Sequence, residues 1–235
     1  FPQDIHILEH IDRLVEIFNA CWPMYAAMPA VLKDAIERSY QKVGWDLRNS
    51  ESEKGIFPTF FDLLDILPGV IEESHYSKDT QSDYVGALCT RVKSLTNGIY
   101  GSVLCAEDAL SDAEMFDQNV IVDLSRVGSM ETKSLLMGIL VMKLQEYRMC
   151  SSGMNSRLRH VTVLEEAHNL LRKTSAEQSQ EGANLQGKSV EMLANAIAEM
   201  RTYGEGFIIA DQAPGLLDMS VIRNTNTKII LRLPD

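Results

Sequence analysis

The chain has 235 residues, which is enough for one large α/β domain or for a core that carries a smaller helical insertion. Its 45% hydrophobic and 23% charged residues exclude a disordered or fibrous protein. The net charge of −11 argues against a surface that coats nucleic acid, although a ring protein can confine basic contacts to its pore loops. No apolar run approaches the roughly 20 residues of a membrane helix, so we expect no membrane partner.

The four cysteines are widely scattered and contain no C-x-x-C pair. This spacing predicts neither a zinc framework nor a disulfide-rich secreted fold. Reduced thiols, and with them a cytoplasmic location, are the simplest expectation. The sequence opens on Phe1-Pro2-Gln3 and closes within a strand-like run, so we expect both ends to be truncated.

The first half of the chain, residues 1–118, is predicted to be mainly helical. Apolar residues recur at helical spacing over residues 11–18 and again over 31–36, before Gly44. Thr59 is followed by Asp62, the pattern of a capping box at a helix start. We expect this half to be a helical segment or insertion of a larger core.

The second half, residues 119–235, changes to alternating strands and helices. Helical segments at 131–147 and 188–203 separate short β-rich runs, which cover residues 119–124, 161–164, 206–210 and 228–233. These runs are continuous and apolar rather than alternating, as in strands buried on both faces. Strand–helix–strand alternation predicts a parallel, doubly wound sheet.

Two adjacent carboxylates, Glu165 and Glu166, follow the run at 161–164. The carboxyl edge of a strand is where ligands bind in open α/β sheets. In a nucleotide hydrolase, Glu165 would hold Mg²⁺ through water and Glu166 would polarise the attacking water. A solvated acidic strand end is the alternative, because two neighbouring glutamates are common. His168, just beyond, is expected to cap or orient the strand end.

A second strand, at 206–210, also ends in polar residues. Gln212 could donate a hydrogen bond to a γ-phosphate or to the attacking water, as a sensor. Arg201, before this strand, could act as a finger on a neighbouring subunit's nucleotide, because a planar guanidinium stabilises phosphoryl charge. Local sequence alone favours a surface salt bridge of Arg201 with Glu199 or Glu205.

The order of these motifs resembles the HerA-type ATPases of the HerA/FtsK class. The matching segments run L-E-E-A-H-N-L, E-M-R-T-Y-G-E-G, I-I-A-D-Q-A-P and R-N-T-N-T-K-I-I-L-R, within residues 119–235. The resemblance implies a RecA-like P-loop NTPase core, with a mostly parallel sheet flanked by helices and a helical subdomain in the N-terminal half.

The resemblance also implies a hexameric ring that uses ATP and Mg²⁺ to move double-stranded DNA. Relatives work as translocases or helicases with a nuclease or another effector protein, in end resection, plasmid transfer or anti-phage defence. In that setting Glu165 binds Mg²⁺, Glu166 activates water and Gln212 senses the γ-phosphate. Arg201 or Arg223 would act in trans on the adjacent subunit.

Two departures from the family pattern affect this expectation. Glu165 stands where aspartate is commoner, which preserves a metal-binding carboxylate. No phosphate-binding loop precedes the first apolar strand, so the resemblance places that loop upstream of Phe1. The isolated chain would then be inactive as an ATPase. A non-catalytic scaffold or nucleotide-switched oligomer remains the alternative function, and a polymer other than DNA the alternative substrate.

Two short motif matches are rejected. Residues 182–189 fit G-x-x-x-x-G-K-[ST], but no apolar strand precedes them, so we predict a mobile loop over 172–187 leading into a helix from Lys188. Residues 6–10 fit the zinc-protease pattern H-x-x-E-H, but no third ligand is identifiable. For His6 and His10 we expect the polar face of an amphipathic helix.

Overall fold

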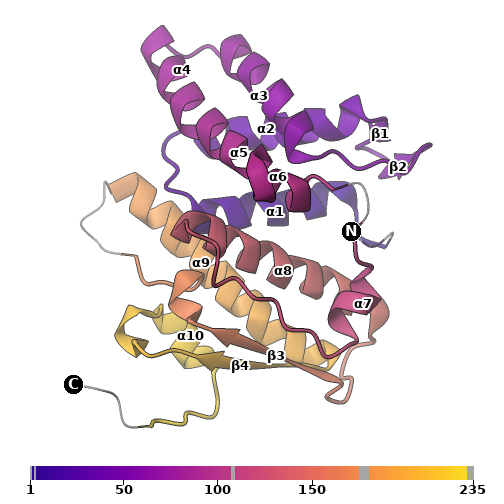
Figure 1. The fold of residues 1–235 in the computed structure, drawn as a ribbon, viewed down its shortest axis with the longest axis vertical. Coiled ribbons are helices and arrows are strands. Elements are labelled where there is room, and N and C mark those ends of the chain that lie inside the picture. Colours follow the sequence, from indigo (N-terminus) through magenta and orange to yellow (C-terminus); the bar gives the residue numbers. More distant parts are fainter. Residues whose placement is uncertain (1, 3, 107–108, 175–179, 232–235) are drawn as a thin grey trace. The chain divides into compact units, whose positions relative to one another are not determined.

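The computed structural model describes residues 2, 4–106, 109–174 and 180–231, without the side chains of 180–184 (Figure 1). It divides into two compact units. One comprises residues 1–5, 16–24 and 111–235, and the other comprises 6–15 and 25–110. Helix α1 (Ile7–Cys21) therefore contributes its first half to one unit and its second half to the other.

The unit formed by residues 6–15 and 25–110 is helical. Beyond α1 it contains α2 (Met28–Lys42), α3 (Phe60–Glu73), α4 (Lys78–Tyr84), the π-helical turn η1 (Val85–Cys89), α5 (Thr90–Thr96), α6 (Gly98–Leu104) and the short antiparallel strands β1 (Trp45–Asp46) and β2 (Glu51–Ser52). Leu32, Leu67 and Leu88 are fully buried in its core. The predicted capping box is confirmed, because the Thr59 N–H donates to Asp62 Oδ2 at 2.9 Å.

The other unit is a mixed α/β structure. It contains α7 (Asp112–Phe116), α8 (Met130–Ser151), β3 (His160–Glu165), the 3₁₀ turn η2 (Ala167–Asn169), α9 (Gln180–Glu199), the 3₁₀ turn η3 (Met200–Tyr203), β4 (Glu205–Ala210), the 3₁₀ turn η4 (Pro214–Leu216) and α10 (Met219–Asn224). Strands β3 and β4 pair in parallel, with His160 opposite Glu205 and Glu165 opposite Ala210. Figure 1 shows α8 and α9 along one side of this pair. The predicted parallel strand–helix–strand unit is confirmed.

Two of the four predicted strands are wrong within the described residues. Residues 119–124 and 228–231 pair with no other strand, and 232–233 lie outside the described residues. Ile121 is 95% exposed and Ile230 is 85% exposed. Val163, in β3, is also more than half exposed, so burial of the strands on both faces is wrong as well. A β-rich run becomes a strand only where a neighbouring backbone completes its hydrogen bonds, and β propensity does not supply that neighbour.

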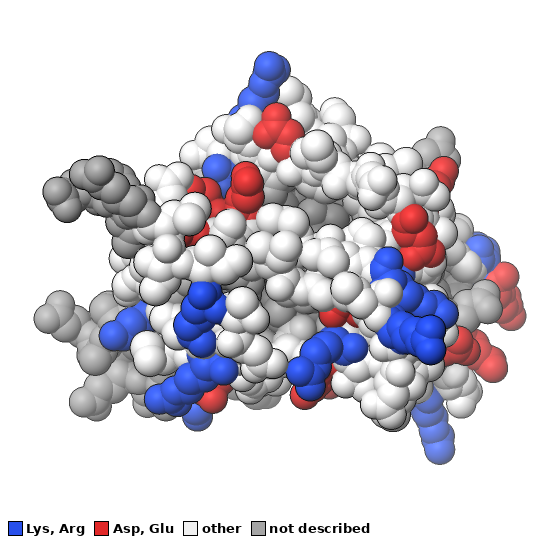
Figure 2. All heavy atoms as spheres, turned by 90° about the horizontal axis from the view of Figure 1, so that it is seen from below, with Lys and Arg blue, Asp and Glu red and all other residues white. Residues whose placement is uncertain are grey.

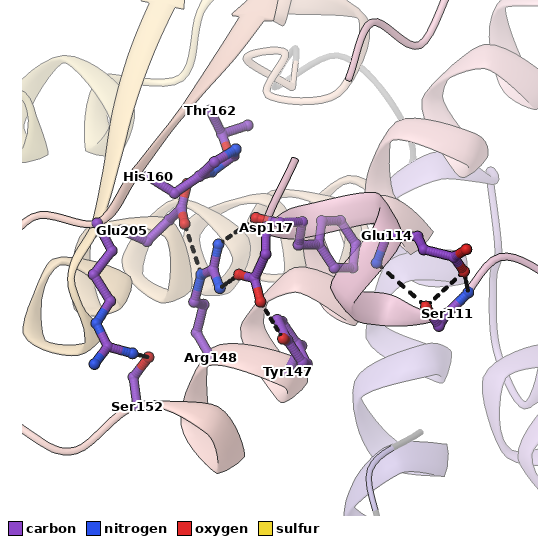
Figure 3. Close-up of polar contacts among 11 residues, drawn as sticks. Ser111, Glu114, Asp117, Tyr147, Arg148, Ser152, His160, Thr162 and Glu205 are labelled. Carbon is purple, nitrogen blue, oxygen red and sulfur yellow. Dashed lines mark hydrogen bonds and ion pairs between the residues drawn. The ribbon is translucent and has the colours of Figure 1, made fainter. Parts of the chain in front are cut away.

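The starting ends of β3 and β4 are tied to α8 by a buried ion pair (Figure 3). Arg148, only 2% exposed, donates from Nε to Glu205 Oε2 at 2.9 Å. The other Glu205 oxygen accepts from the Thr162 hydroxyl at 2.7 Å and lies 2.8 Å from His160 Nδ1. Both oxygens of this fully buried carboxylate are therefore paired, as a buried charge requires.

Asp117 extends this network to the end of α7. Its carboxylate accepts from Arg148 Nη1 at 2.6 Å and from the Tyr147 hydroxyl at 2.5 Å. Hydrogen bonds from Tyr147 and then Arg148 hold the pKa of Asp117 below its usual value. The start of the strands is thus anchored to two helices by side chains from 31 to 57 residues away along the chain.

Candidate functional site

The carboxyl ends of β3 and β4 bring together polar residues from two distant segments. Because Glu165 and Ala210 are the paired last residues of the two strands, the residues that follow each strand start at one edge of the sheet. Gln212 Nε2 donates to Glu166 Oε1 at 3.0 Å. Two of the residues singled out in the sequence therefore lie in direct contact, although their chemical roles remain predictions.

The backbone at Glu166 is left-handed, with φ 50° and ψ 47°. Non-glycine residues seldom adopt this conformation, and when they do the surrounding structure has to hold it. The turn η2 follows directly, and the Asn169 N–H donates to the Glu166 carbonyl at 2.9 Å. The chain therefore turns sharply as soon as β3 ends at Glu165.

The Glu165 side chain is exposed and takes part in no hydrogen bond or ion pair with any residue that the structure describes. The Glu166 side chain is about half exposed, and no lysine or arginine that the structure describes forms an ion pair with it. No described lysine or arginine pairs with either carboxylate, and His168 Nδ1 lies 3.6 Å from Glu166 Oε2. Both are thus accessible to a ligand from solvent.

Asp211 and His168 form a second contact at this edge, and sequence reasoning gave Asp211 no role. The Asp211 side chain is 3% exposed, and its Oδ2 accepts from the His168 N–H at 2.8 Å and lies 2.9 Å from His168 Nδ1. Its Oδ1 accepts from the Ala213 N–H at 2.7 Å. Burial raises the pKa of Asp211, but these hydrogen bonds lower it by more, so the net pKa is below the usual value.

The loops that leave the two strands are joined further along. The Lys173 N–H donates to the Leu216 carbonyl at 2.8 Å, and the Asp218 N–H donates to the Leu171 carbonyl at 2.9 Å. In addition, the Ser134 hydroxyl of α8 donates to the carbonyl of Asn169. The segments that follow β3 and β4 are therefore held in place by backbone hydrogen bonds to each other and by a hydrogen bond from α8.

Neither predicted arginine has a contact with Glu165, Glu166 or Gln212 among the described residues. Arg201 is exposed in η3, at the start of β4, and β4 spans about 20 Å before Gln212. Among the described residues, no ion pair joins Arg201 to Glu199 or Glu205, because Glu205 binds Arg148 and His160 instead. Arg223 is exposed in the last turn of α10 and has no described contact with Glu165, Glu166 or Gln212. A role for either arginine in trans remains a prediction.

The two rejected motifs occupy helical positions. Residues 182–189 lie in α9, and the Ser189 hydroxyl donates to Glu16 Oε2 at 2.6 Å, so this segment does not form a phosphate-binding loop. The predicted loop over 172–187 is wrong from Gln180 onward, and its part at 175–179 lies outside the described residues. His10 is buried with its ring 6.2 Å from that of Tyr40, so its predicted place on a polar face is also wrong.

The donor set at the strand ends suits a partly hydrated Mg²⁺. Within residues 4–106, 109–174 and 180–231, no three or more His, Cys, Asp or Glu side chains are arranged to hold a metal ion. Mg²⁺ in nucleotide sites usually keeps several waters and uses one or two carboxylates together with phosphate oxygens. Glu165 and Glu166 could supply those one or two carboxylate ligands.

No helix in the described part of the chain has the length and hydropathy to cross a membrane.

Comparison with known proteins points to one fold. No protein-family model and no curated protein matches the sequence. Among solved structures, VirB4 of Thermoanaerobacter pseudethanolicus matches with a TM-score of 0.59 and 18% sequence identity, over 92% of this chain and 53% of that one. The chain has the fold of that region of VirB4.

At 18% sequence identity, this match shows a shared fold and no more. Since the chain spans about half the length of VirB4, the activity and partners of a complete protein go beyond the match.

Proposed function

We propose that this chain is part of an ATP-hydrolysing motor subunit that moves double-stranded DNA. The observation that carries the proposal is the hydrogen bond between Gln212 and Glu166, at the shared carboxyl edge of two adjacent parallel strands. Ligands of open α/β sheets bind at this edge. An accessible carboxylate held by an amide suits the task of orienting water for attack on a phosphate.

Each strand-end residue has a distinct task in this proposal. Glu166 accepts a hydrogen bond from the attacking water, and Gln212 orients either that water or the γ-phosphate. The exposed carboxylate of Glu165 would hold Mg²⁺ through water. A bound Mg²⁺ would neutralise charge on the β- and γ-phosphates.

The full motor is proposed as a hexameric ring of identical subunits that acts with a nuclease or another effector. The exposed positions of Arg201 and Arg223, both outside the ion pairs of the described residues, leave them accessible to a neighbouring subunit. A guanidinium supplied in trans stabilises the phosphoryl charge of the transition state.

The charge pattern is compatible with local rather than extended DNA contacts. Figure 2 shows Lys and Arg side chains at several separate places on one face, with acidic side chains near some of them. The chain as a whole carries a net charge of −11. Binding through a few phosphate contacts would make the DNA dependence of activity sensitive to salt.

The test is steady-state ATP turnover by the complete protein that contains this chain, with and without linear double-stranded DNA. We expect DNA to stimulate turnover and Glu166→Gln to lower it about 10²- to 10⁴-fold without a change in melting temperature. The matched control is Glu191→Gln, an exposed glutamate on α9 that should leave turnover unchanged.

The other outcomes separate the alternatives. Turnover that survives Glu166→Gln removes Glu166 from the mechanism. Turnover that ignores DNA favours a nucleotide-switched oligomer or a motor for another polymer. No turnover, together with a stable ring in the absence of nucleotide, identifies an assembly scaffold.

A further inference from the structure

His168 and Asp211 lie beside Glu166 but have no part in the chemistry proposed above. The Nδ1 atom of His168 lies 2.9 Å from Asp211 Oδ2 and 3.6 Å from Glu166 Oε2. Asp211 is 3% exposed and His168 is 19% exposed, whereas Glu166 is 46% exposed. A largely buried pair therefore stands directly behind a carboxylate that faces solvent.

The hydrogen bonds define the state of this pair. An ionised carboxylate has only acceptor atoms, so the neutral His168 ring must carry its proton on Nδ1 to bind Asp211. The same Asp211 oxygen also accepts from the His168 backbone N–H at 2.8 Å. Because one oxygen holds both the backbone and the ring, the orientation of the imidazole is determined by Asp211.

Two residues that follow β4, Asp211 and Gln212, thus determine which side chains lie next to Glu166. Gln212 donates to Glu166 Oε1 at 3.0 Å. Asp211 holds the His168 ring so that Nδ1 lies 3.6 Å from Glu166 Oε2, a close contact rather than a hydrogen bond. An exposed glutamate has several accessible rotamers and loses entropy when it is held in one of them. The left-handed backbone at Glu166 likewise has to be held by its surroundings, and the His168 N–H bond anchors the turn that follows it.

We propose that His168 and Asp211 are a positioning pair that keeps the Glu166 carboxylate in one orientation toward the attacking water. The inference rests on the function proposed above, because it assigns Glu166 to water activation. Neither residue of the pair would touch the nucleotide. Their effect would come through orientation, and a displacement of about 1 Å at a reacting group can cost as much as 100-fold in rate.

The experiment measures kcat and KM for ATP in the complete protein. His168→Ala should lower kcat about 10- to 100-fold while KM changes less than about threefold, since positioning acts on the chemical step. Asp211→Asn should cause a similar loss, because in either amide orientation its NH₂ group faces the Ala213 N–H or the two His168 donors, so one anchor of the pair is lost. The double variant should lose no more than the larger single loss, because the two residues act as a unit.

His168→Asn provides the rescue, because asparagine Nδ2 takes the place of histidine Nδ1 and can still donate to Asp211. It should restore most of the wild-type kcat. The matched control is His75→Ala, which removes an exposed histidine in another part of the chain and should leave both constants unchanged.

The positioning role would be refuted by any one of four results: wild-type kcat in His168→Ala, additive losses in the double variant, a change in KM alone, or no rescue by His168→Asn. If His168→Ala does not fold, the comparison of His168→Asn with Asp211→Asn replaces it. Near-normal turnover of His168→Asn together with impaired turnover of Asp211→Asn supports the pair. Equal turnover of the two variants refutes it. Turnover that survives Glu166→Gln removes the proposed function itself, whereas its loss alongside a normal His168→Ala removes only the pair.

Discussion

The two ends of the β3–β4 ladder place carboxylates in opposite environments. At the start, Glu205 is fully buried, and its oxygens are paired with Arg148, Thr162 and His160. At the finish, Glu165 is exposed without a described partner, and Glu166 is about half exposed on a left-handed backbone. The same strands thus carry a closed ionic network at one end and accessible carboxylates at the other.

This difference separates stability from function along one short sheet. A buried carboxylate whose oxygens are all paired has no capacity for a ligand, and removal of its partner exposes the full desolvation penalty. An exposed carboxylate contributes little to folding but remains able to bind a metal or orient water. We therefore expect substitutions at the starting end to change the free energy of unfolding, and substitutions at the finishing end to change turnover.

The largest expected effect is that of Arg148→Met, which leaves Glu205 buried without its cation. Loss of one partner of a buried pair typically costs about 3–5 kcal/mol, and urea unfolding followed by circular dichroism would measure it. The control is Arg38→Met, which breaks exposed pairs with Asp34 and Glu73 and should cost at most about 1 kcal/mol. Equal costs for the two variants would show that the Arg148 network does not hold the strands.

Thr162→Val should have a smaller effect at the same end. It removes the 2.7 Å hydrogen bond to Glu205 while it preserves a β-branched residue in β3, and hydrogen bonds to charged groups contribute about 1.5–3 kcal/mol. On the exposed face of the same strand, Val163→Thr should change stability by less than about 0.5 kcal/mol. A neutral Thr162→Val would mean that Glu205 does not need its third partner.

Asp117→Asn tests the pH dependence of the network. Because the folded-state pKa of Asp117 is below its unfolded value, its contribution is present above the unfolded pKa and is lost as pH falls through the lowered folded pKa. Stability of the wild type should therefore decline below about pH 4, and the decline should be shallower in Asp117→Asn. Identical slopes in unfolding experiments between pH 6 and pH 2 would contradict this.

The smallest effect on stability is expected for Glu165→Gln. Because the Glu165 side chain is exposed and has no described partner, the substitution should change the free energy of unfolding of the protein by less than about 0.5 kcal/mol. Turnover of the complete protein should fall, and a higher Mg²⁺ concentration should be needed for half-maximal activity. A large loss of stability would place Glu165 with the structural carboxylates and remove the contrast between the two ends.

Much of the secondary structure was predictable because its signals are local. Helical periodicity located α1 and α2, the alternation of strands and helices indicated α8, and the Thr59–Asp62 pair marked the start of α3. The apolar runs at 161–164 and 206–210 correctly indicated β3 and β4. The equally apolar runs at 119–124 and 228–231 form no strand, since composition does not supply a partner for their backbone groups.

The division of the chain at residue 118 and the roles of the site residues remain predictions. Sequence reasoning selected Glu165, Glu166 and Gln212 from the polar residues at strand ends, and the last two lie in contact. It assigned no role to Asp211, although an aspartate directly before Gln212 at the same strand end was a usable signal. The structure shows that this aspartate is buried. The partners of Arg148 were not predictable, because no local pattern links it to Glu205.

The sequence by itself determined helices α1, α2 and α8, the capping box of α3, strands β3 and β4 and the acidic pair at a strand end, because these depend on spacings of a few residues. Only the tertiary structure decided which polar groups meet. Glu166 contacts Gln212 across 46 positions, His168 contacts Asp211 across 43 and Arg148 contacts Glu205 across 57. The first two pairs form because parallel pairing of β3 and β4 aligns their ends, which no local spacing specifies.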